Sequence, residues 1–301
     1  MSGALSNVAR ALLALFAGAT AIGLAPIFVR LSELGPVATP FYRLLLALPV
    51  LGLWLLYESR RNSTVPRGDY RLLLVAGLFF AADLAVWHWS IRFTSVANAT
   101  LLANSAPLFV TLASWLWFGQ RIKTRLLLGM AVAFSGAVLL MGESVNLSQT
   151  RVTGDGLGLL TAVFYAGYII TVTHLRARQS AARVMFWSGV VCCLTLLPVA
   201  MISGEALLPH TVRGWLVLAS LALVSHAGGQ GLITYALAHL PATFSSVTLL
   251  WQTVAAAFLA WLWLNEPLSY VQMGGGVVVL AGILLARRSV SPVKQSIEEL
   301  R

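Results

Sequence analysis

The stretch SWLWFGQRIK at residues 114–123 recurs as AWLWLNEPLS at residues 260–269, 146 positions further along the chain. The same slide places Gly129 on Gly275, with aliphatic residues facing aliphatic residues between these points. Similarity at a fixed spacing within one chain indicates that one ancestral unit occurs twice. The sequence therefore predicts a fold made of two related halves.

Composition indicates what kind of unit was duplicated. Of the 301 residues, 58% are hydrophobic and only 10% are charged, whereas soluble domains carry about 25% charged residues. We therefore expect an all-α polytopic membrane protein. Apolar runs near the length of about 20 residues that crosses a bilayer predict ten transmembrane helices, at 9–31, 37–57, 71–91, 95–118, 125–142, 157–175, 182–203, 213–238, 242–265 and 269–287.

Ten spans in two copies give five spans per copy, and this odd number fixes how the copies are related. The fourth span would run inward and its copy, the ninth, would run outward, so we expect inverted repeats. The predicted boundaries are 1–145 for the first repeat, 146–288 for the second and 289–301 for a cytoplasmic tail. Because the connections between spans are short, we expect no soluble domain.

Basic residues predict the orientation, since they accumulate in cytoplasmic loops. With the N-terminus in the cytoplasm, 15 of the 20 basic residues lie on the inner side and 4 outside, and Arg43 lies within a span. We therefore expect both termini to be cytoplasmic in a protein of the inner membrane. This bias accounts for the net charge of +10, so the predicted partners are a small-molecule substrate and the lipid bilayer, and not nucleic acid.

The first apolar run has an alternative interpretation as a signal peptide, because Ala17, Gly18 and Ala19 form a small-x-small pattern. The run is longer than a typical signal-peptide core and has a counterpart in the second half of the chain. A membrane span is therefore the favoured interpretation.

The repeated Trp motif is typical of a membrane interface, where the Trp ring lies among apolar groups and its indole N–H remains hydrated. Inversion places one copy at each face. The first copy ends in Gln120 and Arg121 at the cytoplasm, and the second ends in Glu266 and Pro267 outside, where Pro suits the first turn of the next helix. An aromatic belt with helix capping explains most of this motif.

The run SIRFTSVANATLLANSAPLFVTLASWLWFGQRI (90–122) and its second copy YALAHLPATFSSVTLLWQTVAAAFLAWLWLNEPL (235–268) resemble the EamA-type transporters of the drug/metabolite transporter superfamily. The resemblance covers nearly the whole chain. It implies ten helices in two inverted halves, with a central cavity lined mainly by spans 1, 3, 4, 6, 8 and 9 and with spans 5 and 10 as scaffold. Members usually carry Glu at the end of both phrases, and Gln120 departs from that pattern. The resemblance implies export of metabolites, amino acids or drugs without naming a substrate.

Ionisable residues within a span are costly and are candidates for function. Asp83 in the third span and Arg43 in the second are the two that lie well inside an apolar run. At 1.5 Å per residue, Arg43 lies about 9 Å and Asp83 about 12 Å below the outer end of its helix. We therefore expect a structural ion pair between them. The alternative is that Asp83 carries a proton or binds a substrate amine.

Polar residues on later spans predict a binding pocket near the middle of the membrane. His226, Gln230 and Thr234 are four apart and would share one helix face, although a lone His is equally often a packing residue. Pro107 predicts a kink in the fourth span because it removes a backbone donor. Aromatic residues at helical spacing can also be simple packing. The candidate substrate-binding residues are Thr20, Asp83, Trp87, Asn98, Asn104, Tyr165, Tyr168, His226, Gln230, Trp251 and Gln252.

The favoured function is a secondary transporter, an exporter of small metabolites, amino acids or drugs that works by alternating access. A metabolite uptake carrier or a lipid flippase of the same fold remains the alternative. No catalytic, cofactor or metal motif is present, so an enzyme is not expected. Cys192 and Cys193 are interpreted as small hydrophobes. The Gly274-Gly275-Gly276 run is interpreted as close packing against the fifth span or between subunits of a monomer or weak homodimer.

Overall fold

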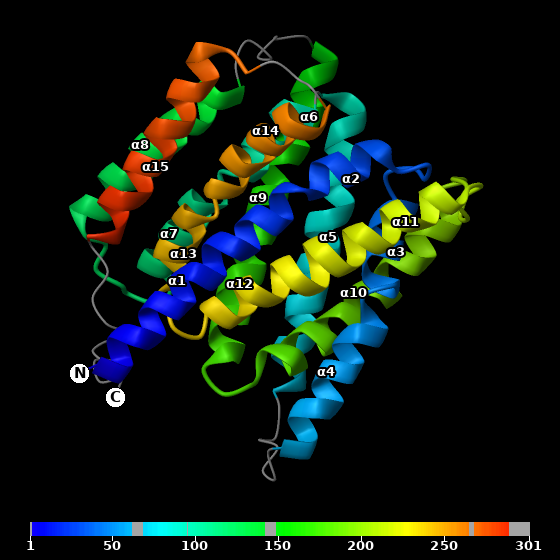
Figure 1. Cartoon of the computed structure of the whole chain (residues 1–301), viewed down its shortest axis with the longest axis horizontal. Coiled ribbons are helices and arrows are strands. Elements are labelled where there is room, and N and C mark those ends of the chain that lie inside the picture. Colours follow the sequence, from blue (N-terminus) through cyan, green and yellow to red (C-terminus); the bar gives the residue numbers. More distant parts are fainter. Residues whose placement is uncertain (1, 62–68, 95, 142–148, 265–267, 289–301) are drawn as a thin grey trace.

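The computed structural model describes residues 2–61, 69–94, 96–141, 149–264 and 268–288, and within these ranges every regular element is a helix. Nine helical stretches of the described chain are long and apolar enough to cross a membrane, and Thr124–Leu140 is a shorter apolar helix. Figure 1 shows them as one bundle of tilted helices. The predicted class, an all-α polytopic membrane protein, is confirmed.

The first five spans are built from eight helices. They are α1 (Ser2–Gly23), α2 (Ala25–Leu31), α3 (Ala38–Leu45), α4 (Leu48–Arg61), α5 (Tyr70–Phe93), α6 (Val96–Ala103), α7 (Ala106–Leu116) and α8 (Thr124–Met141). Three of these spans are each split into two helices. The prolines Pro26 and Pro107 stand in the first turns of α2 and α7, where a missing N–H is tolerated.

The remaining five spans are broken at the third and fourth. They are α9 (Gln149–Arg176), α10 (Ala181–Ile202), a third span made of α11 (Val212–Ser220), η2 (Leu221–Gln230) and α12 (Gly231–Ala236), a fourth made of α13 (Ala242–Thr248) and α14 (Trp251–Leu264), and α15 (Tyr270–Arg287). The segment η2 is a π-helix, whose i→i+5 winding often marks functional sites.

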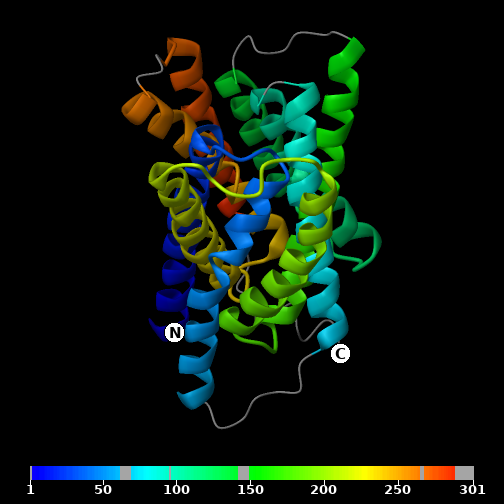
Figure 2. The same cartoon turned by 90° about the vertical axis from the view of Figure 1, so that its right-hand side faces the viewer.

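The two halves run through the bundle in opposite directions. The helix α1 starts at one face, called here the N-terminal face, and α9 starts at the opposite or distal face (Figures 1 and 2). The distal start of α9 lies beside the end of α5, where Ser90 Oγ donates a hydrogen bond to the Gly154 carbonyl (2.7 Å). The predicted inversion is therefore confirmed.

The two copies of the Trp phrase lie at opposite faces. In the first copy α7 ends at Leu116, and the next residue, Trp117, is 78% exposed. Phe118 packs on His174 at the N-terminal end of the bundle, with 4.8 Å between the ring centroids. The second copy ends at the distal face, beside the start of α15. Glu266 and Pro267 lie outside the described residues, so their predicted capping role stays a prediction.

The helices α8 and α15, the fifth spans of the two halves, lie side by side (Figure 1). Their backbones approach so closely that a Cβ built on Gly275 would lie 2.6 Å from Leu140 N, and one on Gly136 would lie 2.5 Å from Val279 N. Only glycine permits this approach. The predicted packing of the Gly274–Gly276 run against the fifth span is confirmed for Gly275.

Two carboxylates join loops of the two halves at the distal face. Glu33, after α2, accepts hydrogen bonds from His210 N (2.9 Å) and from the backbone and hydroxyl of Thr211 at the start of α11. Glu205, after α10, accepts from Val37 N (2.9 Å) and Ala38 N (3.1 Å) at the start of α3. Each carboxylate therefore satisfies unpaired N–H groups at a helix N-terminus of the opposite half.

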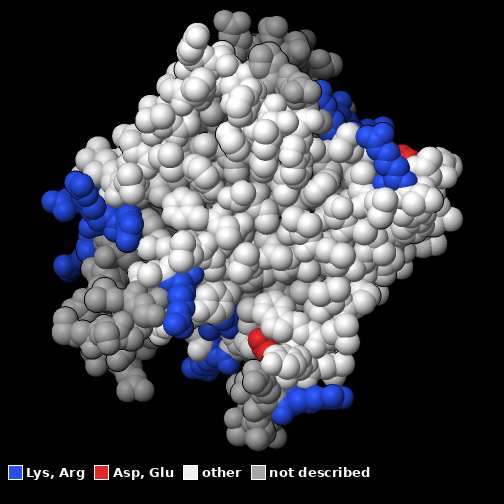
Figure 3. Space-filling model, in the orientation of Figure 1, with Lys and Arg blue, Asp and Glu red and all other residues white. Residues whose placement is uncertain are grey.

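Surface charge follows the expected membrane pattern. Figure 3 shows a broad uncharged middle, with the Lys and Arg side chains at its margins. The apolar middle exposes many large side chains, such as Leu13 (72%) and Leu194 (65%). Lipid tails would cover such a surface in a bilayer.

Candidate functional site

A cavity of about 790 Å³ lies between the two halves of the bundle. The first half contributes residues of α1, α2, α3, α5, α6 and α8, and the second half contributes residues of α9, η2, α14 and α15. Its lining reaches the distal face at Gly35, Leu268 and Gln272. The family resemblance implied a cavity lined by spans 1, 3, 4, 6, 8 and 9. The structure agrees on these six spans and adds the second span through Thr39 and Arg43. It also adds Leu140 of the fifth span and Gln272 of the tenth, which the resemblance gave as scaffold.

Most of the charged side chains that line the cavity are basic. Among the described lining residues, the basic ones are Arg30, Arg43 and Arg92, and the acidic one is Asp83. Arg43 is 5% exposed and Asp83 is 9% exposed. Charges in a low-dielectric cavity are weakly screened.

The predicted ion pair between Arg43 and Asp83 stays a prediction, and the two residues interact electrostatically. The two residues do line the same cavity, as their predicted depths required. The Arg43 Nε atom is buried without a hydrogen-bond partner. At 1.5 Å per residue Asp83 lies about 15 Å from the distal end of α5, and Arg43 about 8 Å from the start of α3.

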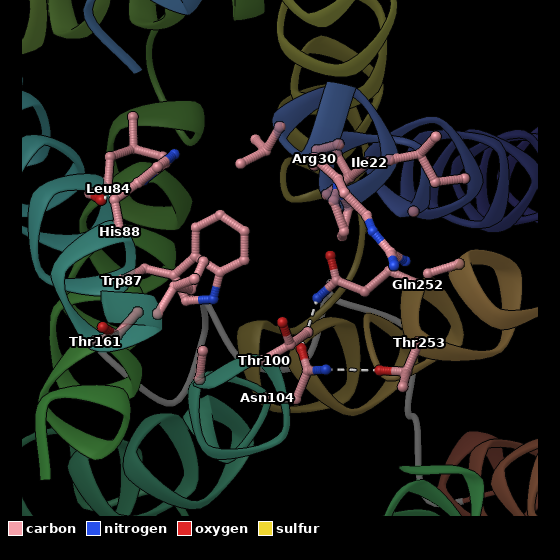
Figure 4. Close-up of a pocket in the computed structure, with 18 of the residues that line it drawn as sticks. Ile22, Arg30, Leu84, Trp87, His88, Thr100, Asn104, Thr161, Gln252 and Thr253 are labelled. Carbon is pink, nitrogen blue, oxygen red and sulfur yellow. Dashed lines mark hydrogen bonds between the residues drawn. The ribbon is translucent and has the colours of Figure 1, made fainter. Parts of the chain in front are cut away.

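A chain of hydrogen bonds joins the fourth spans of the two halves across the cavity wall. Gln252 Nε2 donates to Asn104 Oδ1 (2.9 Å), and Asn104 Nδ2 donates to Thr253 Oγ1 (2.6 Å) (Figure 4). Asn104 and Gln252 are 148 positions apart, close to the repeat spacing. Their contact therefore lies near the axis that relates the two halves.

Helix breaks explain why polar side chains are available at this depth. The fourth span is interrupted between Ala103 and Ala106, where Ser105 Oγ donates to the Leu102 carbonyl (2.6 Å). The kink predicted from Pro107 is confirmed. Its counterpart in the other half is interrupted between Thr248 and Trp251. Both breaks lie next to the chain of hydrogen bonds.

Six of the predicted substrate-binding residues line the cavity: Asp83, Trp87, Asn104, Tyr165, Gln230 and Gln252. In Figure 4 the Trp87 indole extends from the α5 side and the Gln252 amide from the α14 side. Trp87 and Tyr165 add aromatic surface beside the polar groups. The cavity can therefore contact both the charged and the apolar parts of a small molecule.

Thr20 and Trp251 are not among the residues that line the cavity. Trp251 Nε1 donates to Thr20 Oγ1 (2.9 Å), and its ring packs edge-on against Phe16 (5.8 Å between centroids). They thus connect α1 to α14. Their role in substrate binding stays a prediction. Mid-membrane depth places a residue along its helix but does not say which way its side chain points.

Tyr168 and His226 are likewise packed beneath the cavity and not in its lining. The Phe80 ring stacks on Tyr168 (4.7 Å) and on His226 (5.4 Å). His226 was expected to share a face with Gln230, which does line the cavity. Both residues lie in the π-helix η2, and the His226 ring is stacked on Phe80 and does not line the cavity. Asn98 belongs to α6, and its side chain lies outside the described part of the chain.

Several lining residues were not predicted. They include Arg30, Thr39, His88, Thr100, Thr161 and Thr253. His88 Nδ1 contacts the Leu84 carbonyl (2.7 Å) and its Nε2 is buried without a partner. Single threonines give no signal in an apolar run, because they satisfy their hydroxyl on the helix backbone as readily as they face a cavity. Thr161, whose hydroxyl donates to the Leu157 carbonyl (3.0 Å), is an example.

Comparison with known proteins gives one consistent family. The profile of the EamA-like transporter family matches residues 9–142 and again residues 152–288. The chain belongs to the EamA-like transporter family, and it is accordingly a membrane transporter.

Its relatives include proteins named as exporters. The pseudopaline exporter CntI of Pseudomonas aeruginosa is 31% identical over 240 residues, which is 79% of this chain and 83% of that one. A probable terminal-alkyne amino-acid exporter of Streptantibioticus cattleyicolor is 30% identical over 204 residues, 67% of each chain. A solved crystal structure superposes with a TM-score of 0.78 over 97% of this chain and all of that one, and at 16% identity it shows the fold alone.

Proposed function

We propose that the protein exports small carboxylate-bearing metabolites across the inner membrane by alternating access. The cavity of about 790 Å³ between the inverted halves, with the buried Arg43 in its lining and the Arg43 Nε atom without a hydrogen-bond partner, is the observation that carries this proposal. Inverted-repeat transporters bind their substrates at the interface of the repeats near the middle of the membrane. Two relatives named as exporters support the direction of transport.

The orientation follows from basic residues at the N-terminal face. Arg10, Arg60, Arg125, Arg178 and Arg287 lie at that end of the described chain, and such residues favour the cytoplasm. The distal face then lies outside the cytoplasm, and the cavity is open in that direction. This conformation is the one from which an exporter releases its substrate.

Aromatic stacking closes the cavity toward the N-terminal face. Phe80 lines the cavity and stacks on Tyr168 and His226 beneath it, so three different spans (α5, α9 and η2) meet there. Below this stack Thr234 Oγ1 donates to Met185 Sδ (3.2 Å) and Arg176 Nε donates to the Thr234 carbonyl (2.9 Å). Inward opening requires these contacts to separate, while the α8–α15 pair remains a fixed scaffold.

A flux screen in proteoliposomes tests this function. The purified protein would be tested with amino acids, other small carboxylates, nucleosides and cationic drugs, with and without a pH gradient. We expect carboxylate-bearing compounds to be transported and cationic drugs to be excluded. Flux of cations alone would contradict the proposed substrate class. Scrambling of labelled phospholipid without solute flux would establish the flippase alternative, and obligatory inward flux in oriented cells would establish an uptake carrier.

A further inference from the structure

Resting on the alternating-access function proposed above, we propose that α2, α3 and the loop between them form the distal gate of the cavity. In this proposal Glu33 and Glu205 are a clasp that holds the gate open. The gate comprises residues 25–45 and is called here the α2–α3 segment. It closes over the cavity when the two carboxylates release the helix N-termini that they bind.

The α2–α3 segment is bounded by a helix break at each end. The first span is interrupted at Leu24, between α1 and α2, and the second span at residues 46–47, between α3 and α4. At the second break Ala47 N donates to the Leu44 carbonyl (3.0 Å), which is the tighter i→i+3 pattern of a 3₁₀ turn. Such breaks are positions where a segment can turn relative to the rest of its helix. The segment can therefore move without unwinding α1 or α4.

The loop between α2 and α3 is held together internally, so the segment moves as one body. Thr39 Oγ1 donates to the Leu34 carbonyl (3.1 Å), and therefore accepts the hydrogen bond that joins it to Ser32 Oγ (2.9 Å). Ser32 Oγ also accepts from Leu34 N (3.2 Å), and Thr39 N donates to the Gly35 carbonyl (3.1 Å). Leu34 and Gly35 line the cavity, so a displacement of this loop changes the cavity mouth.

The clasp joins this segment to the second half at two points. Glu33 of the loop binds the N-terminus of α11, and Glu205, which follows α10, binds the N-terminus of α3. A Cβ built on Gly35 would overlap the Glu205 carboxylate, so glycine is needed there. Next to the clasp, Tyr42 of α3 packs edge-on against Trp215 of α11 (5.5 Å between ring centroids). The segment is thus held against α11, on the second half, in this conformation.

The chemistry of the clasp suits a contact that opens and closes. The hydrogen bonds of Glu33 to His210 and Thr211 are exposed, so water can replace them when the segment moves. Charge-assisted hydrogen bonds of this kind stabilise one conformation, and salt and water limit their strength. The α8–α15 contact differs, because it depends on close backbone packing. The clasp therefore biases the position of the gate, whereas the glycine contact fixes a scaffold.

A distance measurement across the cavity mouth tests the gate. Leu31, at the end of α2, and Tyr270, at the start of α15, are exposed, and these two helix ends lie apart at the distal face (Figure 1). Spin labels on Leu31→Cys and Tyr270→Cys would be measured by pulsed electron resonance in lipid nanodiscs, where the result does not depend on membrane orientation. The native cysteines are buried. The parent protein should show mainly a long distance.

Variants of the clasp should shift this distribution. In Glu205→Gln and in Glu33→Gln, we expect the fraction at a shorter distance to rise at least about threefold, because the lost charge no longer favours the open gate. Gly35→Ala should do the same, since it displaces the Glu205 carboxylate without removing it. Asp155→Asn is the matched control. Asp155 accepts from Thr94 Oγ1 (2.8 Å) but joins α9 to α5, so the distances should not change.

The outcomes separate this inference from the proposed function. An unchanged distribution in the clasp variants would overturn the clasp, and so would a shift to longer distances, which indicates a loosened fold and not a closing gate. If the distances shorten as expected but the flux screen finds no transported compound, the gate stands and the transport function fails. If a compound is transported and the distances do not shorten, the transporter stands and the clasp does not.

Discussion

Asn104 is the residue on which the polar wall of the cavity depends. Its amide accepts from Gln252 and donates to Thr253, and it is 6% exposed. We predict that Asn104→Ala lowers stability by about 1–3 kcal/mol, because it leaves buried partners unsatisfied, and lowers flux at least tenfold. Thermal unfolding in detergent and proteoliposome flux measure the two effects. Wild-type flux in this variant would show that the chain of hydrogen bonds does not shape the site.

Trp251 and Gln252 are neighbours in sequence, but Gln252 lines the cavity and Trp251 contacts Thr20. Trp251→Phe removes the hydrogen bond to Thr20 but keeps a ring against Phe16, so we expect a loss of about 1 kcal/mol in stability and unchanged substrate affinity. Gln252→Ala should weaken substrate binding instead. The comparison uses one unfolding curve and one binding curve for each variant. A reversed result would mean that the indole, not the amide, faces the substrate.

Adjacent glycines in α15 provide a matched test at the scale of elements. Gly275 faces the α8 backbone, where an added Cβ would lie 2.6 Å from Leu140 N, whereas nothing lies within 4 Å of a Cβ on Gly274. We predict that Gly275→Val separates α8 from α15 and removes most folded protein, while Gly274→Val is tolerated. Fluorescence-detected size exclusion compares the two. Equal yields would contradict the proposed scaffold role of this helix pair.

The distal contact between the two halves depends on a carboxylate. The hydrogen bond from the Thr211 hydroxyl is the largest cause that holds the pKa of Glu33 below its ordinary value, with smaller contributions from the backbone of His210 and Thr211. Glu33 therefore stabilises the folded state fully above the unfolded-state pKa of about 4.3, and this stabilisation is lost as pH falls through the lower folded-state value.

We therefore predict that the melting temperature of the wild-type protein decreases more steeply between about pH 5 and pH 3 than that of Glu33→Gln. The amide does not ionise, so the variant should be less stable near neutrality and should converge with the wild type at low pH. Melting curves across this range measure the difference. Parallel curves would show that Glu33 contributes nothing that depends on its charge.

Orientation and accessibility are properties of the whole molecule. The native Cys192 and Cys193 are buried, so single introduced cysteines can report the two faces. We predict that a membrane-impermeant maleimide labels Leu208→Cys at the distal face of intact cells, and labels Ala177→Cys at the N-terminal face only after lysis. Ala257→Cys, in the cavity lining, should be labelled from outside and protected by a bound substrate. Labelling of Ala177→Cys in intact cells would reverse the proposed direction of transport.

The sequence predicted those features that depend only on helical periodicity and membrane thickness. It did not predict which polar side chains point into the cavity. Asp83, Asn104 and Gln252 were placed in the cavity by their polarity and depth, and they line it. Tyr168 and His226 have the same polarity and depth, yet both pack beneath it against Phe80. Polarity predicts that a residue avoids lipid, but a hydrogen-bonded or stacked position in the bundle satisfies that requirement equally well.

What the sequence determined by itself is the set of spans, their number and the inversion of the two halves. Those features follow from the bilayer, which demands helices of fixed length with internally satisfied backbones. What the tertiary structure alone decided is which polar side chains share one cavity. Helix breaks near Leu24 and Asn104 and the π-winding before Gln230 rotate faces in ways that helical periodicity does not encode. Arg43 and Asp83 illustrate this division: their depth in the sequence predicted that they lie close together, and the packing of α3 and α5 decided that both line the cavity and that the Arg43 Nε atom has no hydrogen-bond partner.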